Sequence, residues 1–398
     1  MSRASLAMLS CAGLFAIAIA ATLMGPSFPL IVKEFNLPLE LVGFLASAWS
    51  AGYLLSSIGG LLSDQYGEIK IITASFLIVI IAASLICVAT SYDLLLILFL
   101  LGGIGAAFGE AAMNPLISKL FQRRSGFALN FLHAFYCFGS FVGPILAVLF
   151  ISWYGSWRLS YLAVVTLFGL LLLVSIFVGR MSQRTGTESK QLGEHVGVYE
   201  LFRDGRILMI TGFFYIGTEM GTNAWLPTFL VLERNFSIWL AGMSLSFFWG
   251  AMAAGRLILG SLTDRFQFRR MIILSSISSS VLILLGISVQ NQIWIVASWS
   301  LCGFVMGPLL PTVFAWTSRQ FSSRSGFATG VIYSLGFFGG VFSPWLLGAI
   351  ADFSSLNLAM IYLFFSTSAI SIAMLAAREP VYLQSETEVQ IDHSESSS

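Results

Sequence analysis

Charged residues are scarce in this chain of 398 residues, where Asp, Glu, Lys and Arg together make up 10% of the sequence. An ordinary soluble domain carries roughly 25%, so the composition excludes a soluble globular protein. The charges nearly cancel to a net +1, which leaves no long-range field to attract nucleic acid. We therefore expect no nucleic-acid partner, and the 57% hydrophobic content indicates that the lipid bilayer is the main partner of the chain.

Cysteine is also rare, and the sequence has no Cys-x-x-Cys spacing that would indicate a metal or redox centre. The four cysteines lie in apolar runs, at Cys11, Cys87, Cys137 and Cys302. A Gly-Lys dipeptide is missing altogether, which excludes a nucleotide-binding P-loop. We therefore expect neither an enzyme nor a resident cofactor or metal. Any work that the protein performs must draw on an ion gradient, of protons or sodium, or on the solute itself.

Long apolar stretches take the place of charge. A membrane-spanning helix needs ~20 mostly apolar residues, and twelve stretches of the sequence qualify. The first, residues 7–32, stays apolar beyond the length of a signal peptide, so we interpret it as a spanning helix. The sequence thus predicts an all-α membrane protein with twelve transmembrane helices.

The predicted helices fall into two sets of six. We expect a first bundle at residues 1–179, a polar linker at 180–206, a second bundle at 207–376 and a disordered tail at 377–398, where Ser and Glu dominate. Basic residues gather in one set of alternate loops, whereas the opposite set holds only Lys33, Arg158 and Arg234. The positive-inside rule then places both termini in the cytoplasm. We expect a monomer in the cell inner membrane.

The two sets are related by a repeat at an offset of 200 residues. Ser125-Gly126-Phe127-Ala128 recurs as Ser325-Gly326-Phe327-Ala328, and Asp64 recurs as Asp264. Two pseudo-symmetric six-helix bundles of parallel topology imply an axis along the membrane normal, with a solute site between the halves.

Two loops at equivalent positions of the repeat share a pattern. Gly60-Leu61-Leu62-Ser63-Asp64-Gln65-Tyr66-Gly67 follows the second predicted helix, and Gly260-Ser261-Leu262-Thr263-Asp264-Arg265-Phe266 follows the eighth. Both loops resemble the signature of the major facilitator superfamily, and this resemblance implies the major facilitator fold.

We expect these loops to form a gate. A carboxylate is favoured beside the exposed N–H groups of a helix N-terminus. Asp64 would therefore meet the start of the eleventh helix, and Asp264 the start of the fifth, when the cytoplasmic side is closed. The alternative is a solvated loop carboxylate. The predicted gate residues are Gly60, Asp64, Gly67, Gly126, Arg256, Gly260, Asp264, Arg265 and Gly326; for Arg256 we expect snorkelling or pairing at the gate.

Polar and ionisable residues are costly within a membrane-spanning helix, so those in the predicted fourth and fifth helices indicate a functional site. Glu110 and Asn114 lie one turn apart in Gly-Glu-Ala-Ala-Met-Asn-Pro, and Asn130 and His133 share a face in Leu-Asn-Phe-Leu-His-Ala-Phe. These segments resemble the fucose:proton symporter family and related sugar carriers. The resemblance implies proton coupling at Glu110 and sugar binding at Asn114 and Asn130. That family carries an aspartate in its first helix, whereas this chain has no acidic or basic residue from Ala4 to Val32.

The predicted seventh helix offers a replacement. Glu219 and Asn223 share a face, and Trp225 could stack on a sugar ring. The alternative is that Glu219 only holds the bundle together and that Trp225 lies in the interfacial belt. We expect coupling at Glu110 and Glu219, and solute binding at Asn114, Asn130, His133, Asn223 and Trp225.

These patterns favour a secondary active transporter that moves a small polar solute, which we expect to be a sugar, by cation-coupled symport with alternating access. Two alternatives stay open at this point. The same fold serves drug or metabolite exporters, and it could also serve a membrane sensor that does not transport. The sequence leaves open the solute, the direction of transport and the choice between proton and sodium.

Overall fold

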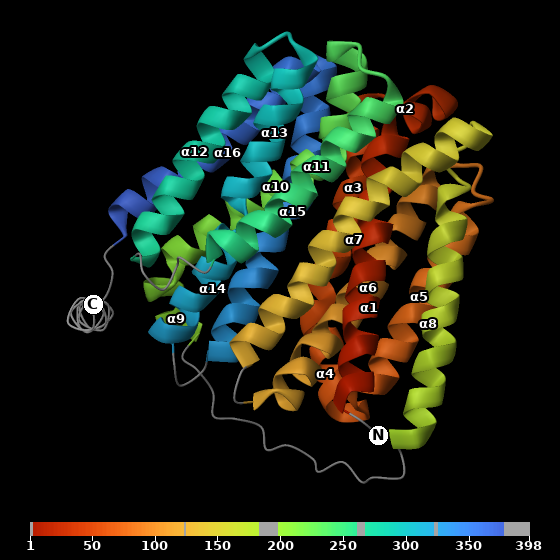
Figure 1. Cartoon of the computed structure of the whole chain (residues 1–398), viewed down its shortest axis with the longest axis vertical. Helices are drawn as coiled ribbons and strands as arrows, with labels where there is room; N and C mark the ends of the chain where they lie inside the picture. The colour runs from red at the N-terminus through yellow and green to blue at the C-terminus, as the bar shows by residue number, and fades with distance from the viewer. Residues whose placement is uncertain (1–2, 123–124, 183–197, 261–266, 322–324, 378–398) are drawn as a thin grey trace.

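The computed structural model of the protein describes residues 3–122, 125–182, 198–260, 267–321 and 325–377. Every regular element in these ranges is a helix (Figure 1), and each has apolar residues on the side that packs against its neighbours. The helices of the first half are α1 (Arg3–Thr22), α2 (Met24–Phe35), α3 (Leu39–Gly52), the short 3-10 helix η1 (Tyr53–Leu55), α4 (Ser56–Tyr66), α5 (Glu68–Ile86), α6 (Tyr92–Leu120), α7 (Ser125–Tyr154) and α8 (Ser160–Ser182).

The second half repeats this plan. Its helices are α10 (Arg206–Arg234), α11 (Ile238–Ile258), α12 (Phe268–Ser288), α13 (Gln292–Met306), α14 (Leu309–Gln320), α15 (Ser325–Phe353) and α16 (Leu356–Ala376). A short helix, α9 (Val198–Asp204), lies within the segment expected to be a plain linker. The offset of 200 residues persists in the structure, because α12 begins 200 residues after α5 and α15 begins 200 residues after α7.

Eleven segments of the described chain are long and apolar enough to cross a membrane. Three of these are composite, formed by α1 with α2, by α3 with η1 and α4, and by α13 with α14. The last break falls at Pro308, whose ring nitrogen cannot donate a helical hydrogen bond. The twelfth span is α10, which is 29 residues long but carries several polar residues. Its polar residues are buried against protein, as a membrane protein requires. The predicted twelve-helix architecture is confirmed.

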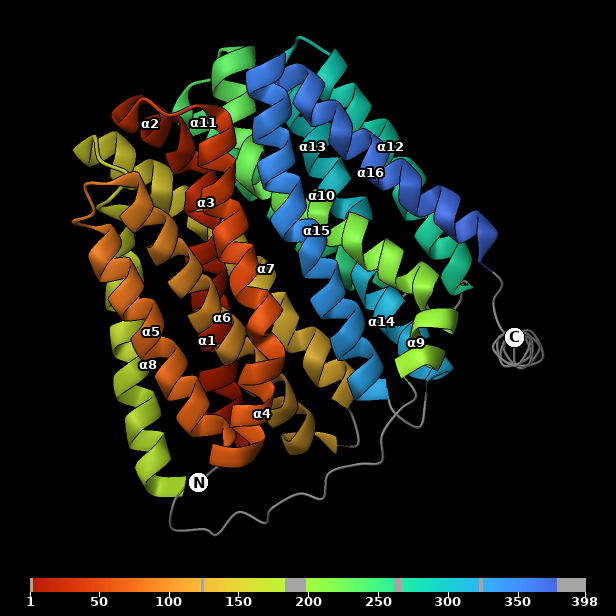
Figure 2. The same cartoon turned by 180° about the vertical axis from the view of Figure 1, so that it is seen from behind.

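Two equivalent helix pairs join the halves. α3 packs on α15, and α11 packs on α7, so the two pairs are related by the repeat. Figures 1 and 2 show the halves side by side, with the N-terminus and the end of α8 at one end of the bundle and the α2–α3 connection at the other. We call these the linker end and the far end.

Close helix packing within each half depends on glycine. A Cβ atom on Gly103 of α6 would overlap the carbonyl oxygen of Trp49 in α3. The equivalent Gly303 of α13 lies in the same way against the carbonyl oxygen of Phe248 in α11. Small residues thus allow two backbones to touch in both halves, as is common between membrane helices.

Candidate functional site between the two halves

Glu110 is a buried carboxylate in the middle of α6, with 3% of its surface exposed. Its Oε1 atom accepts a hydrogen bond of 2.8 Å from the Tyr333 hydroxyl of α15. Its Oε2 atom is buried and has no hydrogen bond of normal geometry among the described residues, and the Tyr53 hydroxyl of η1, in the same half, also interacts with the carboxylate. Glu110 therefore contacts the opposite half through one oxygen and keeps the other available for a proton, a cation or a solute hydroxyl.

Asn114 lies one helical turn beyond Glu110, as predicted. It is half-buried, and its Oδ1 atom also has no hydrogen-bond partner in the part of the chain that the structure describes. On α7 the two predicted residues differ, because His133 is half-buried whereas Asn130 is exposed. The structure thus keeps Glu110 and Asn114 together on one buried face and leaves Asn130 outside that packed face.

Glu219 of α10 has a basic partner within its own half. Its Oε1 atom lies 3.7 Å from Nη2 of Arg256 in α11. The same Nη2 atom lies 3.4 Å from the Tyr215 hydroxyl, to which it donates. Glu219 is 5% exposed and the Arg256 side chain 12%, so this ion pair is largely shielded from solvent.

This arrangement differs from our expectation for Arg256, which was snorkelling or pairing at the gate. The guanidinium is directed into the bundle because Glu219 offers a counter-charge there and removes part of the cost of burying it. His133, Cys137 and Glu110 also lie within electrostatic reach of Arg256. Since the charges of Arg256 and Glu219 offset each other, Glu110 is the acidic group of this centre that is paired with a hydroxyl rather than with a base.

Asn223 and Trp225 are fully engaged in packing in this conformation. The Asn223 Nδ2 atom donates to the carbonyl oxygen of Ala21 in the first half at 3.1 Å, and its Oδ1 atom accepts from Trp249 Nε1 at 3.3 Å. Trp225 is 0% exposed, so it does not lie in an interfacial belt. Its Nε1 atom donates to the carbonyl oxygen of Pro344 at 2.8 Å. A solute could reach these two residues only after the halves rearrange, so their role in solute binding stays a prediction.

The far end carries a set of contacts between the halves that the sequence analysis did not find. The Asp352 carboxylate at the end of α15 accepts hydrogen bonds from the backbone N–H groups of Leu39 at 2.8 Å and Glu40 at 2.7 Å. These donors belong to the first turn of α3, whose N-cap residue, Pro38, supplies no side-chain cap. Asp352 therefore caps α3 from the other half. An N-terminus that lacks a capping side chain of its own is the signal that could have indicated this contact.

Two further bonds extend this closure along α3 and α15. Trp345 Nε1 donates to Glu40 Oε1 at 2.9 Å, and the Ser47 hydroxyl donates to the carbonyl oxygen of Val341 at 2.6 Å. Gly43 lies against the carbonyl oxygen of Pro344, to which a Cβ atom would come within 2.5 Å. The structure is therefore in a conformation that is closed at the far end.

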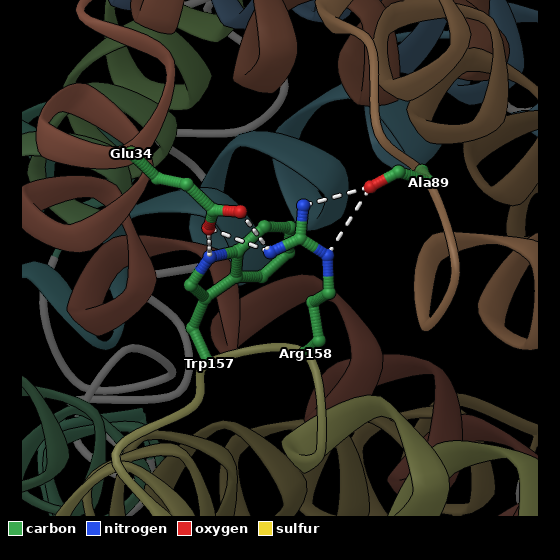
Figure 3. A network of polar contacts seen from close by, with 4 residues as sticks. All are labelled: Glu34, Ala89, Trp157 and Arg158. Carbon is green, nitrogen blue, oxygen red and sulfur yellow. Dashed lines mark hydrogen bonds and ion pairs between the residues drawn. The ribbon is translucent and has the colours of Figure 1, made fainter.

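Within the first half, the far ends of three spans are tied together by one arginine (Figure 3). Arg158 Nη1 contacts both carboxylate oxygens of Glu34 at 2.5 and 2.6 Å. Arg158 also donates to the carbonyl oxygen of Ala89, and Trp157 Nε1 donates to Glu34 at 2.7 Å. These bonds link the end of α2 to the loops before α6 and α8.

Arg234 does the equivalent in the second half. It bonds to the carbonyl oxygen of Ile287 and, at 2.7 Å, to Asn357 Oδ1. Two of the three basic residues expected on the far side are thus structural clamps, one in each half. The clamps fix the far ends within each half, whereas contacts such as those of α3 with α15 and of α7 with α11 join one half to the other.

The architecture and the repeat are consistent with a comparison of the sequence with known protein families. The family model described as Major Facilitator Superfamily matches residues 10–282 and, in a second match, 243–391. The chain belongs to the Major Facilitator Superfamily. Members of this superfamily are membrane transporters, so the protein is a multi-pass membrane transporter rather than an enzyme.

The names of its relatives refer to different compounds. The chain is 22% identical over 334 residues to the glucose/mannose transporter GlcP of Bacillus subtilis (strain 168), covering 81% of this chain and 82% of the relative. It is also 22% identical over 338 residues to the fosmidomycin resistance protein of Escherichia coli (strain K12), covering 83% and 82%. The sodium-dependent glucose transporter 1 of Xenopus laevis is 24% identical over 355 residues, covering 77% and 68%.

The signature segments of the superfamily lie at the linker end. The first differs from the expected loop, because Gly60 and Asp64 lie in the last turns of α4, which ends at Tyr66. Asp64 is exposed, and Gly67, which follows α4, adopts a φ of +91°, which favours glycine. Gly60 and Gly260 have open space where a Cβ atom would be. Gly126 and Gly326 lie in the first turns of α7 and α15, as predicted. Asp264 and Arg265 lie outside the described residues. The predicted cap by Asp64 belongs to the state that is closed at the linker end, so it stays a prediction.

Proposed function

We propose that the protein is a cation-coupled symporter for a small neutral polar solute, a sugar, and that it works by alternating access between its two halves. The observation that carries the proposal is Glu110. It is a buried carboxylate that is hydrogen-bonded across the halves through one oxygen and has no hydrogen bond of normal geometry among the described residues at the other. An ionisable group inside a membrane protein is costly, and such groups commonly serve in ion or proton pathways.

The charge balance of the centre supports a neutral solute. The charge of Arg256 is balanced by Glu219 at 3.7 Å, so the centre offers no net positive charge to an anionic solute. The remaining polar groups of the proposed site are amides, an imidazole and hydroxyls, which suit the hydroxyl groups of a sugar. The relatives named as glucose transporters support the same solute class.

Glu110 is proposed as the coupling group. A carboxyl group in such surroundings can be neutral in one state and charged in another, so that one cation moves with each solute. Glu219 is proposed to assist by holding Arg256. The excess of basic residues at the linker end supports a cytoplasmic position for that end in the inner membrane.

The experiment is uptake of labelled D-glucose by proteoliposomes under an imposed inward gradient of protons or of sodium. We expect accumulation with one of the two gradients, and loss of accumulation with retained counterflow exchange in Glu110→Gln. Glu233→Gln, which changes a carboxylate bonded within the second half at the far end, is the matched control. Accumulation by Glu110→Gln at the parental level would contradict the coupling role. Export of a dye such as ethidium, without glucose uptake, would favour a drug exporter.

A further inference from the structure

The Tyr333 hydroxyl joins the two halves at the middle of the bundle. Tyr333 lies on α15 of the second half, and its hydroxyl donates to Glu110 on α6 of the first half at 2.8 Å. α15 packs on the first half through α3 and η1 at the far end and centre. The Tyr333–Glu110 bond is thus a direct link between α15 and the proposed coupling helix.

Aromatic packing fixes the direction of this hydroxyl. The Tyr333 ring meets Phe337 edge to face at a centroid distance of 5.0 Å, and it meets Phe314 in the same way at 5.7 Å. Phe337 in turn stacks on Tyr53 of the first half at 4.2 Å. Such contacts hold a ring in one orientation, so the hydroxyl is directed at Glu110 rather than free to rotate away with its ring.

Glu110 is surrounded by titratable or charged groups from five elements. These are Tyr53 of η1, Tyr136 of α7, Glu219 of α10, Arg256 of α11 and Tyr333 of α15. Arg256 is the cation of this set, and Glu219 lies 3.7 Å from it. Two hydroxyls of this set interact with the carboxylate. Tyr53 belongs to the same half as Glu110, whereas Tyr333, which forms the hydrogen bond of 2.8 Å, belongs to the opposite half.

We propose that Tyr333 is a positioning residue that transmits the ionisation state of Glu110 to the second half. This inference rests on the proposed coupling role of Glu110. A hydrogen bond to an ionised carboxylate is roughly twice as strong as one to a neutral group. Ionised Glu110 therefore holds α15 in the arrangement described here, and protonated Glu110 holds it less. Loss of the Glu110 proton to water therefore favours the conformation that is closed at the far end. Protonation of Glu110 weakens its bond to Tyr333, so the halves can rearrange.

The test follows the linker end by spin labels and needs no solute. Tyr66 of α4 and Ser318 of α14 are exposed at that end, one in each half. Both are replaced by labelled cysteine in protein that lacks the native cysteines, and the distance distribution is measured in liposomes from pH 5 to pH 9. Tyr333→Phe removes only the hydroxyl.

We expect the open population at the linker end of the parent to rise with pH. In Tyr333→Phe the ratio of open to closed protein should fall by about tenfold at alkaline pH, where Glu110 is ionised, and stay near the parental value at acid pH. Tyr362→Phe is the matched control, because the Tyr362 hydroxyl bonds to Ser343 within the second half at 2.9 Å. It should follow the parent throughout.

The outcomes separate the inference from the function on which it rests. If Glu110→Gln abolishes the pH dependence while Tyr333→Phe follows the parent, the role of Tyr333 is wrong and the coupling role stands. An equal change in Tyr333→Phe at acid and alkaline pH would mean that the hydroxyl is only structural, and this also overturns the inference. If Glu110→Gln keeps the parental pH dependence, the proposed function fails and the inference fails with it.

Discussion

Removal of the Asp352 carboxylate should release the far end. In Asp352→Ala the first turn of α3 loses the acceptor for two backbone N–H groups, those of Leu39 and Glu40. Loss of a helix cap costs ~0.5 to 2 kcal/mol. Because Asp352 is exposed, solvent screens its charge, and water can replace part of the hydrogen bonding in the variant. We therefore assign about 1 kcal/mol to the loss of this cap. The cap exists only when the halves meet, and its loss should therefore favour the open far end about fivefold.

The measurement is the distance between spin labels at Lys33 of α2 and at Ser354 after α15, which are both exposed and lie on opposite halves at the far end. This readout does not depend on which side of the membrane the far end faces. Asp352→Ala should enlarge the long-distance population about fivefold, and Asp352→Asn should do so less because its amide oxygen still accepts.

The matched control is Glu233→Ala. Glu233 also accepts from a helix N-terminus, at Leu356 N (3.1 Å), but both residues belong to the second half. It should lower stability without opening the far end. If Asp352→Ala and Glu233→Ala give the same distance distribution as the parent, the cap between halves does not hold the far end closed.

Three further predictions concern the gate and the packing. Asp64→Asn should raise the open population at the linker end by up to several-fold, since a cap is worth ~0.3 to 2 kcal/mol, and thiol accessibility from that end measures this. Unchanged accessibility would mean that Asp64 is only a solvated residue near the end of α4. Gly103→Ala should lower the melting temperature in detergent by several degrees because its Cβ atom overlaps the Trp49 carbonyl, and parental stability would contradict the close packing. Arg158→Ala should lower the melting temperature by a few degrees by releasing Glu34, with Arg158→Lys intermediate; equal melting temperatures would mean that the clamp contributes nothing.

Much of the fold could be predicted because a membrane helix must satisfy its backbone internally and face lipid, which imposes length and hydropathy on the sequence. Helix α10 illustrates the limit of this hydropathy requirement. The predicted second bundle begins at residue 207, one residue after the observed start of α10 at Arg206, although this helix is too polar to count among the apolar spans of the structure.

The contacts between halves could not be predicted in the same way. Tyr333 and Glu110 are 223 positions apart and share no motif, so only the packing of α15 brings them together. Asp352 is one carboxylate among several near helix ends, and its partners are backbone groups that carry no sequence signal. The direction of Arg256 depended on a counter-charge in another helix, which its position in α11 alone does not reveal.

The two buried carboxylates differ in which half supplies their partner, and this difference bears on how coupling would work. Glu219 and Arg256 belong to α10 and α11 of the same half. Movement of the halves as rigid units leaves their separation unchanged, so the free energy of this pair does not distinguish one conformation from another. Glu110 and Tyr333 belong to opposite halves, and the same movement alters their bond. A ligand shifts a conformational equilibrium only when its binding energy differs between the states. On the proposed coupling role, a cation that binds at Glu110 would therefore drive the movement, whereas one that binds at Glu219 would first have to displace Arg256.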